Sequence, residues 1–235
     1  MPLFPARPEL IAHRGAKLEL RENTLPAFVR AVERGAEGIE LDVHATADGV
    51  IVVHHDLMLG GLVTPAEGAG RHIRTMTAAE LSTYRFPDGS GIPTLQDVLE
   101  ELAAAATIYV EVKGVGIEAL VAQVIAPFAE RVAVHAFDHR IPSRVVGALP
   151  GTPTGILQAS YLIDPVAAMA AAGARDLWQY WELIDAPLVD VVHAAGGRVI
   201  AWTANDPDVI RTLAAWGVDG ICSDDLRVVR AALGE

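Results

Sequence analysis

The chain has 235 residues, of which 51% are hydrophobic and 20% are charged, and its formal net charge is −12. This composition is typical of a globular protein and excludes a disordered or collagen-like chain. A surface this negative repels a phosphate backbone, so we expect no nucleic-acid partner, and phosphate chemistry would need a local basic pocket.

Two features of the sequence bear on where the protein works. No apolar run approaches the roughly 18 residues that span a bilayer, and the opening MPLFPARPEL lacks the hydrophobic segment of a signal peptide. The single Cys222 cannot form an internal disulfide, which agrees with a reducing compartment. We therefore expect a cytoplasmic protein with a small-molecule substrate; the sequence leaves the oligomeric state open, a homo-oligomer included.

From residue 9 onward, β-branched runs alternate with amphipathic helical stretches. Strands are predicted at 9–15, 38–46, 107–113, 131–137, 153–159, 175–181, 198–204 and 220–224. Helices are predicted at 23–35, 94–103, 117–129, 143–150, 164–173, 186–196, 206–217 and 225–234. Eight such units in this length predict a closed TIM (β/α)8 barrel of α/β class rather than an open doubly wound sheet.

The run VIVVHHD does not fit this alternation and is predicted to form a β-hairpin with the second strand. Asp48-Gly49, flanked by strand formers, predicts a two-residue turn. In that register Asp42 lies opposite His55, so we expect the side chain of His55, rather than that of His54, to face Glu40 and Asp42. A slip of one residue would reverse this choice.

A long glycine-rich segment interrupts the barrel pattern at about residues 57–91. Loops of this length in compact domains are usually functional or disordered. We interpret it as a short cap insertion, a lid that selects the substrate, within one domain covering residues 1–235.

Polar side chains gather at the carboxyl ends of three predicted strands, where the active sites of barrels form. They are His13, Arg14, Glu40, Asp42, Glu111 and Lys113. Three carboxylates are hard oxygen ligands that suit Mg²⁺ or Ca²⁺. Two histidines, His13 and His55, can serve as general acid and general base, and the two cations can neutralise a phosphate.

Motifs along nearly the whole chain resemble the glycerophosphodiester phosphodiesterase family, whose members are barrels related to phosphatidylinositol phospholipase C. The matching stretches are HRG at 13–15, ENTLPAF at 22–28, GAEGIELDV at 35–43, TADG at 46–49, VVHHD at 52–56, IPTLQDVLE at 92–100, VEVK at 110–113, AWTAND at 201–206 and GVDGICSD at 217–224. The combination is highly specific.

The resemblance implies a role for each of these side chains. His13 and His55 would be the acid–base pair. Three carboxylates would hold the divalent metal, namely Glu40, Asp42 and Glu111. Arg14 and Lys113 would contact the phosphate, with Trp202 lining the glycerol side. The implied reaction is hydrolysis of a glycerophosphodiester to glycerol 3-phosphate and an alcohol; the alternative substrates are lysophospholipids or sugar phosphodiesters.

The chain departs from the family at two places. Ser223-Asp224-Asp225-Leu226 stands where a Thr-Asp-x-Pro pattern is usual, and the cap has GGLVTP in place of an Asp-Arg-Thr-Thr run. We expect Asp224 to be a turn or cap residue and His44 to be solvated. His135 and Phe137 either line the pocket or pack in the core.

Two rival functions use the same residues. A metal-assisted aldolase or isomerase would use Lys113 as a base or Schiff-base amine, and a non-catalytic binding protein would retain the barrel without the reaction. The paired histidines beside an arginine favour phosphate chemistry. Every catalytic position that the resemblance implies is occupied, which weakens the non-catalytic alternative.

Overall fold

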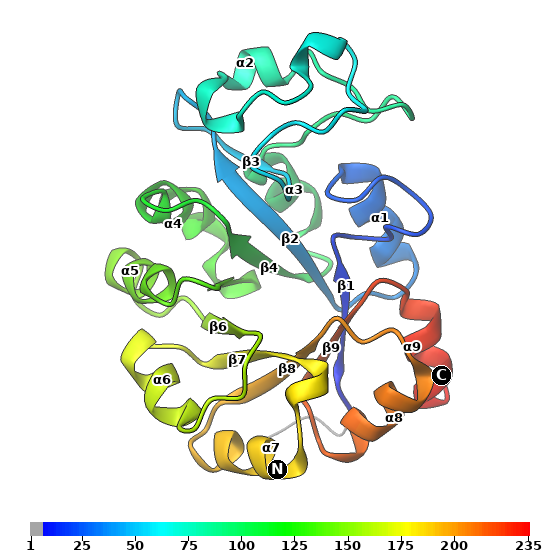
Figure 1. Ribbon diagram of the computed structural model, residues 1–235, viewed down its shortest axis with the longest axis vertical. Coiled ribbons are helices and arrows are strands. Elements are labelled where there is room, and N and C mark those ends of the chain that lie inside the picture. Colours follow the sequence, from blue (N-terminus) through cyan, green and yellow to red (C-terminus); the bar gives the residue numbers. More distant parts are fainter. Residues whose placement is uncertain (1–6) are drawn as a thin grey trace.

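The computed structural model describes residues 7–235 and confirms the predicted barrel (Figure 1). In the described part of the chain, eight parallel strands are hydrogen-bonded in the order β1-β9-β8-β7-β6-β5-β4-β2, and β2 pairs with β1 to close the ring. The strands are β1 (Glu9–His13), β2 (Gly38–Ala45), β4 (Thr107–Val112), β5 (Val132–Ala136), β6 (Thr154–Gln158), β7 (Asp176–Tyr180), β8 (Arg198–Trp202) and β9 (Gly220–Ser223). The expectation about a signal peptide concerns residues that lie mostly outside the described part.

Helices surround the barrel and follow the predicted segments closely (Figure 1). They are α1 (Leu25–Glu33), α3 (Leu95–Leu102), α4 (Glu118–Ile125), α5 (Arg140–Ala148), α6 (Pro165–Ala172), α7 (Ala186–Ala194), α8 (Pro207–Ala215) and α9 (Leu226–Leu233). Five of them begin after an Asp or Thr whose side chain accepts a backbone N–H of the first turn, which fixes where each helix starts. No helix among residues 7–235 is long and apolar enough to cross a membrane.

Alternation along the strands separates two environments. On β2, Ile39, Leu41 and Val43 pack outward into the main apolar core between strands and helices. Glu40 and Asp42 take the opposite face and are buried inside the barrel. A second apolar cluster, which contains Tyr109, Trp178 and Cys222 among others, fills the barrel interior, as is usual for this fold.

The cap forms its own apolar cluster beside the barrel. Segment 57–91 contains the short helix α2 (Ala78–Leu81) and two 3₁₀ turns, η1 (Ala66–Gly68) and η2 (Ile73–Thr75). Its buried side chains are Leu59, Val63, Ile73, Met76, Leu81, Tyr84 and Phe86, which pack with Val52 of the hairpin. Figure 1 shows this segment in cyan, outside the ring of helices.

The predicted hairpin exists, but its predicted register is wrong by one residue. β3 (Ile51–Val53) pairs with β2 so that Val43 lies opposite Val53. The turn has three residues instead of two: Thr46 N–H donates to the Val50 carbonyl, and Gly49 adopts a left-handed φ of 82°. A type I turn closed by a left-handed glycine is the common three-residue alternative to the two-residue turn.

Candidate active site

The corner after β1 places Arg14 over the barrel mouth. The Arg14 N–H donates to the Glu40 carbonyl at 2.9 Å, and Arg14 has a φ of 59°. Gly15 follows with a φ of 83°, and a Cβ there would lie 2.8 Å from the Ala27 backbone. Only glycine fits that close approach, which gives the HRG motif a structural reason.

Two buried carboxylates, Glu40 and Glu111, lie close together inside the barrel. Burial, reinforced by the negative charges of Asp42 and Glu111, raises the pKa of Glu40 well above its usual value. Burial also raises the pKa of Glu111, to about 7, although the Lys113 ammonium opposes the shift. A cation bound between these two carboxylates would therefore stabilise their ionised forms.

Asp42 is fully buried and is already surrounded by positive groups. Its Oδ2 lies 3.1 Å from Arg14 Nε and accepts a hydrogen bond from Asn23 Nδ2 at 2.8 Å, while Oδ1 lies 3.2 Å from Lys113 Nζ. Burial alone would raise the pKa of Asp42, but Lys113 and Arg14 outweigh it and lower this pKa to about 2. Asp42 is therefore ionised and holds both cations in place.

Lys113 extends from the end of β4 between two carboxylates. Its Nζ lies 2.7 Å from Glu111 Oε1 as well as 3.2 Å from Asp42 Oδ1. Burial would lower the pKa of Lys113, but these two carboxylates raise it above the usual value. A charged ammonium suits a phosphate ligand and disfavours the Schiff-base amine of the rival aldolase.

His13 is oriented by a carboxylate from the last strand. Its Nδ1 lies 2.6 Å from Asp224 Oδ1, so Nδ1–H donates to the carboxylate and Nε2 is left to accept a proton. That Nε2 lies 4.0 Å from Glu40 Oε2. Burial lowers the pKa of His13 despite the opposing effect of its hydrogen bond to Asp224, so the ring is neutral and can act as a base.

The two hairpin histidines lie in different surroundings. His54 N–H donates to the Asp42 carbonyl, yet its buried ring stacks on Phe86 of the cap at 6.3 Å between centroids. His55 is 35% exposed, and its Nδ1 lies 2.8 Å from Asp56 Oδ1. β3 ends at Val53, so strand alternation no longer governs these side chains, and His55 faces the groove even though the register that predicted it is wrong.

Aromatic rings form a wall beside Lys113. Trp202 packs edge-on against Phe137 and Tyr180, with centroids 5.5 Å and 5.7 Å apart. The buried Trp202 Nε1 has no hydrogen-bond partner among the described residues. Lys113 Nζ lies 6.0 Å from the Phe137 ring. An indole with an unpaired N–H can line a pocket for a hydroxylated ligand.

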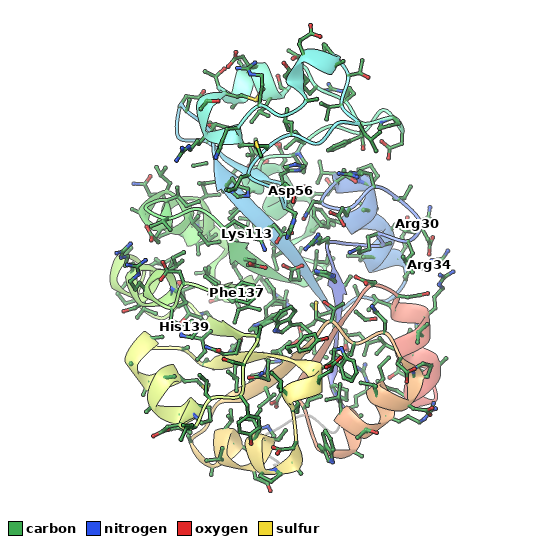
Figure 2. The ribbon with its side chains drawn as sticks, viewed as in Figure 1. Arg30, Arg34, Asp56, Lys113, Phe137 and His139 are labelled. Atoms are coloured by element: carbon green, nitrogen blue, oxygen red, sulfur yellow. The ribbon has the colours of Figure 1, made fainter. Side chains whose placement is uncertain are left out.

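An open groove lies between Lys113 at the barrel mouth and the cap. It has a volume of about 740 Å³ and is lined by His44, His55, Asp56, Lys113 and cap residues 57–61 and 69–70. Figure 2 shows Asp56 close to the cap and Lys113 beside β2 and β4, on the part of the barrel nearer the cap. This volume lies within the range of small-molecule sites.

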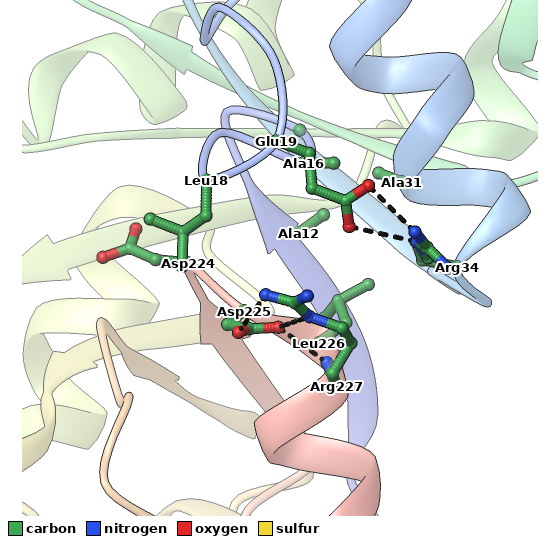
Figure 3. Close-up of a pocket in the computed structure, with 11 residues that line it drawn as sticks. Ala12, Ala16, Leu18, Glu19, Ala31, Arg34, Asp224, Asp225, Leu226 and Arg227 are labelled. Carbon is green, nitrogen blue, oxygen red and sulfur yellow. Dashed lines mark hydrogen bonds and ion pairs between the residues drawn. The ribbon is translucent and has the colours of Figure 1, made fainter.

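A second pocket near Asp224 is too small for a substrate. It has a volume of about 20 Å³, room for about one water molecule. Figure 3 shows two ion pairs among the side chains that line it, Glu19 with Arg34 and Asp225 with Arg227. Asp224, which also lines this pocket, contacts His13 and Lys17 instead. The pocket therefore supports the corner between β1, α1 and α9 rather than the chemistry.

The structure brings together most of the predicted site residues and adds others. The sequence interpretation missed Asn23, as well as Asp224, which it assigned to a turn or cap, and it left His135 open. His44, expected to be solvated, is buried, and its Nε2–H donates to the His55 carbonyl. Asp224 could have been found, because it ends a predicted strand at the same rim as His13.

The donor set fits a divalent cation. Among residues 7–235, Glu40, Glu111 and His135 each offer one ligand atom, and these three atoms lie within 4.8 Å of one another. All three residues are buried, and two of them are acids whose pKa values are raised chiefly by that burial. Asp42, the third predicted ligand, adjoins this group on the same face of the sheet, opposite Glu111 in the strand register.

Comparisons with known proteins agree with this geometry. The model of the glycerophosphoryl diester phosphodiesterase family matches residues 13–228. A glycerophosphodiester phosphodiesterase from Caldanaerobacter subterraneus subsp. tengcongensis is 32% identical over 231 residues, which cover 92% of this chain and 93% of that protein. The crystal structure of a glycerophosphodiester phosphodiesterase from Agrobacterium tumefaciens is 25% identical, with a TM-score of 0.84 over 95% of this chain and 99% of that one.

An Oleispira antarctica phosphodiesterase, solved in complex with the product sn-glycerol-3-phosphate, has the same fold. It is 22% identical, with a TM-score of 0.87 over 97% of this chain and 98% of that one. The family model, the curated relative and the barrel thus point the same way. The chain belongs to the glycerophosphoryl diester phosphodiesterase family and is a hydrolase.

Proposed function

We propose that this enzyme hydrolyses a glycerophosphodiester to glycerol 3-phosphate and an alcohol, with His13 and His55 moving the protons. The observation that carries the proposal is the meeting of these two histidines with Arg14 and Lys113 around buried acids at one barrel mouth. The product bound to the Oleispira antarctica relative supports glycerol 3-phosphate as the product here.

A divalent cation is part of the proposal. Glu40 and Glu111 would hold it, together with Asp42 as the family resemblance implies, and oxygen donors of this kind suit Mg²⁺ or Ca²⁺. When bound, it would neutralise negative charge on the phosphoryl oxygens. Binding to the phosphate falls to Arg14 and Lys113, whose side chains Asp42 holds toward the mouth.

The histidines have complementary roles in the proposal. His13 Nε2 accepts the proton of the glycerol hydroxyl that attacks phosphorus, because Asp224 fixes its other nitrogen as a donor. His55 donates a proton to the departing alcohol oxygen, and Asp56, whose Oδ1 lies 2.8 Å from His55 Nδ1, orients the ring. Water then opens the cyclic phosphate: His55 takes a proton from that water, and His13 returns one to the glycerol oxygen.

The direct test is release of free glycerol 3-phosphate from glycerophosphocholine by purified protein. We expect product in the presence of Mg²⁺ or Ca²⁺ and none after thorough chelation with EDTA, with activity restored by adding the ion back. Activity that survives chelation would contradict the metal dependence. Product release from no glycerophosphodiester in a panel of head groups would contradict the reaction itself.

Exposed apolar side chains favour a lysophospholipid as a second candidate substrate. Among residues 7–235, eight of the ten large apolar side chains that are exposed lie in loops that follow β1, β3, β4, β5 or β6. They are Leu18, Leu57, Met58, Leu62, Val115, Phe137, Tyr161 and Ile163. Apolar groups gathered around a catalytic mouth are suited to a substrate whose glycerol carries an acyl chain, with the head-group alcohol as the leaving group.

This second substrate has a simple test. Leu57 and Met58 line the groove together with His55. If the acyl chain lies on them, the double variant Leu57→Ser/Met58→Ser should lose kcat/KM for lysophosphatidylcholine and keep its value for glycerophosphocholine. Equal losses of kcat/KM for both substrates, or no loss for either, would show that these two side chains do not bind the acyl chain.

A further inference from the structure

His135 lies deep in the barrel beside the two buried acids. It is 1% exposed and stands on β5 in register with Glu111 on β4. Neighbouring residues in register on parallel strands project from the same face of the sheet. The imidazole therefore enters the barrel interior at the level of the carboxylates.

The distances within this group match those around a bound metal ion. One ligand atom from each of Glu40, Glu111 and His135 lies within 4.8 Å of the other two, and His135 Nε2 is 3.9 Å from Glu40 Oε1. Metal–ligand bonds of about 2.0–2.2 Å place neighbouring ligand atoms about 3–3.5 Å apart. A shift of about an ångström would bring the three donors to such distances.

A separate observation concerns the other nitrogen of this ring. His135 Nδ1 is buried and has no hydrogen-bond partner among the described residues. The ring stacks on Trp178 with centroids 4.1 Å apart and planes 6° apart, which fixes its orientation. The stacked ring is held with Nε2 3.9 Å from Glu40 Oε1, so the nitrogen on the side of the acids is placed to meet a cation bound between them.

Asp42, the third acid of the site, has different partners. Asp42 contacts Arg14, Lys113 and Asn23, so its charge is neutralised by the protein's own groups. The close group is thus two carboxylates and one imidazole instead of three carboxylates. Transition-metal ions such as Mn²⁺, Co²⁺ and Zn²⁺ accept an imidazole beside carboxylates, whereas Mg²⁺ and Ca²⁺ favour oxygen alone.

We propose that His135 is a direct ligand of the divalent cation and that this centre prefers Mn²⁺, Co²⁺ or Zn²⁺ to Mg²⁺ and Ca²⁺. The inference rests on the proposed metal-dependent function, and it revises the preference for Mg²⁺ or Ca²⁺ that the three carboxylates suggested. His135 thereby sets which ion the enzyme uses.

Pulsed EPR of the Mn²⁺-loaded protein tests the ligand without any assay of activity. We expect a ¹⁴N coupling in the wild type that is lost in His135→Gln and retained in His13→Gln, whose ring is the other imidazole close to Glu40. A wild type without ¹⁴N coupling would overturn the proposal whether or not any variant folds. Loss of the coupling in His13→Gln, with retention in His135→Gln, would overturn it too.

Calorimetric titration of the metal-free protein tests the selectivity. Because removal of a partner in the outer shell already lowers metal affinity about 10- to 100-fold, His135→Gln should weaken Mn²⁺ binding at least that much. Ca²⁺ affinity should change little, and His54→Gln, a buried histidine outside the group, should leave both unchanged. Equal effects on Mn²⁺ and Ca²⁺ would contradict the assignment.

These measurements separate the inference from the proposed function. Hydrolysis of glycerophosphocholine by a protein without ¹⁴N coupling would refute the ligand and keep the reaction. A ¹⁴N coupling lost specifically in His135→Gln, in a protein that releases no glycerol 3-phosphate with any ion, would keep the ligand and refute the reaction.

Discussion

A single carboxylate from the last strand decides which nitrogen of His13 can accept a proton. Asp224 Oδ1 accepts a hydrogen bond from His13 Nδ1–H. Asp224 Oδ2 accepts a second one from Asn205 Nδ2 at 2.8 Å, which fixes the orientation of the carboxylate. Burial would raise the pKa of Asp224, but the hydrogen bond from His13 and the charge of Lys17 hold it well below its usual value. Asp224 is therefore an anion at every working pH.

We predict that Asp224→Asn lowers kcat by about 10²- to 10⁴-fold with little change in KM, because an amide can donate to Nδ1 and leave Nε2 protonated. Asp225→Asn is the matched control: Asp225 caps α9, and Asn caps a helix as well as Asp does, so this variant should keep both its stability and its kcat. Steady-state kinetics and thermal melts separate the two. Similar kinetics for both variants would show that Asp224 has only a structural role.

At the scale of elements, the hairpin after β2 supplies a catalytic candidate from an irregular segment. His55 lies beyond the end of β3, and its carbonyl accepts a hydrogen bond from His44 Nε2–H at 3.0 Å. The next residues continue directly into the cap. The position of His55 therefore depends on how the cap packs, as well as on the barrel strands.

We predict that His55→Ala lowers turnover by about 10²- to 10⁴-fold, the usual contribution of a general acid or base. His54→Ala should cost far less turnover. Its buried ring stacks on Phe86, so that variant should instead lower the melting temperature. Kinetics and melts of both variants check this, and the opposite ranking of turnover would assign the role to His54.

At the scale of the molecule, closure of the barrel brings together acidic side chains that lie on different strands. Pairing of β1, β2, β4 and β5 brings Glu40 and Glu111 together inside the barrel, away from water. Their raised pKa values report the energetic cost of that arrangement. A bound cation should therefore stabilise the whole fold.

We predict that a saturating divalent ion raises the melting temperature by about 5–10 °C. A ligand at 100 times its Kd adds about 2.7 kcal/mol, and each kcal/mol shifts a domain of this size by about 2–4 °C. Glu40→Gln removes one donor, so it should melt near the wild type in EDTA and gain much less from the ion. Calorimetric melts check this; a wild type indifferent to every divalent ion would exclude a resident metal.

Much of the fold could be predicted because local patterns determine it. The alternation of β-branched runs with amphipathic stretches gave all eight barrel strands of the described chain, and motifs such as HRG and VEVK marked the strand ends that carry the site. Strand period and barrel closure then sufficed to direct Glu40, Asp42 and Glu111 inward. These inferences required only the local sequence pattern and the rule that barrel active sites form at the carboxyl ends of the strands.

Other features depended on contacts between residues far apart in the sequence. The choice between a two- and a three-residue turn shifted the hairpin register, and Ala47 N–H is held by the Met76 carbonyl from the cap. Asp224 reaches His13 across 211 residues, and His135 reaches Glu40 across strands. Sequence periodicity assigns a side chain to a face, whereas only packing of the closed barrel decides which side chains on that face touch.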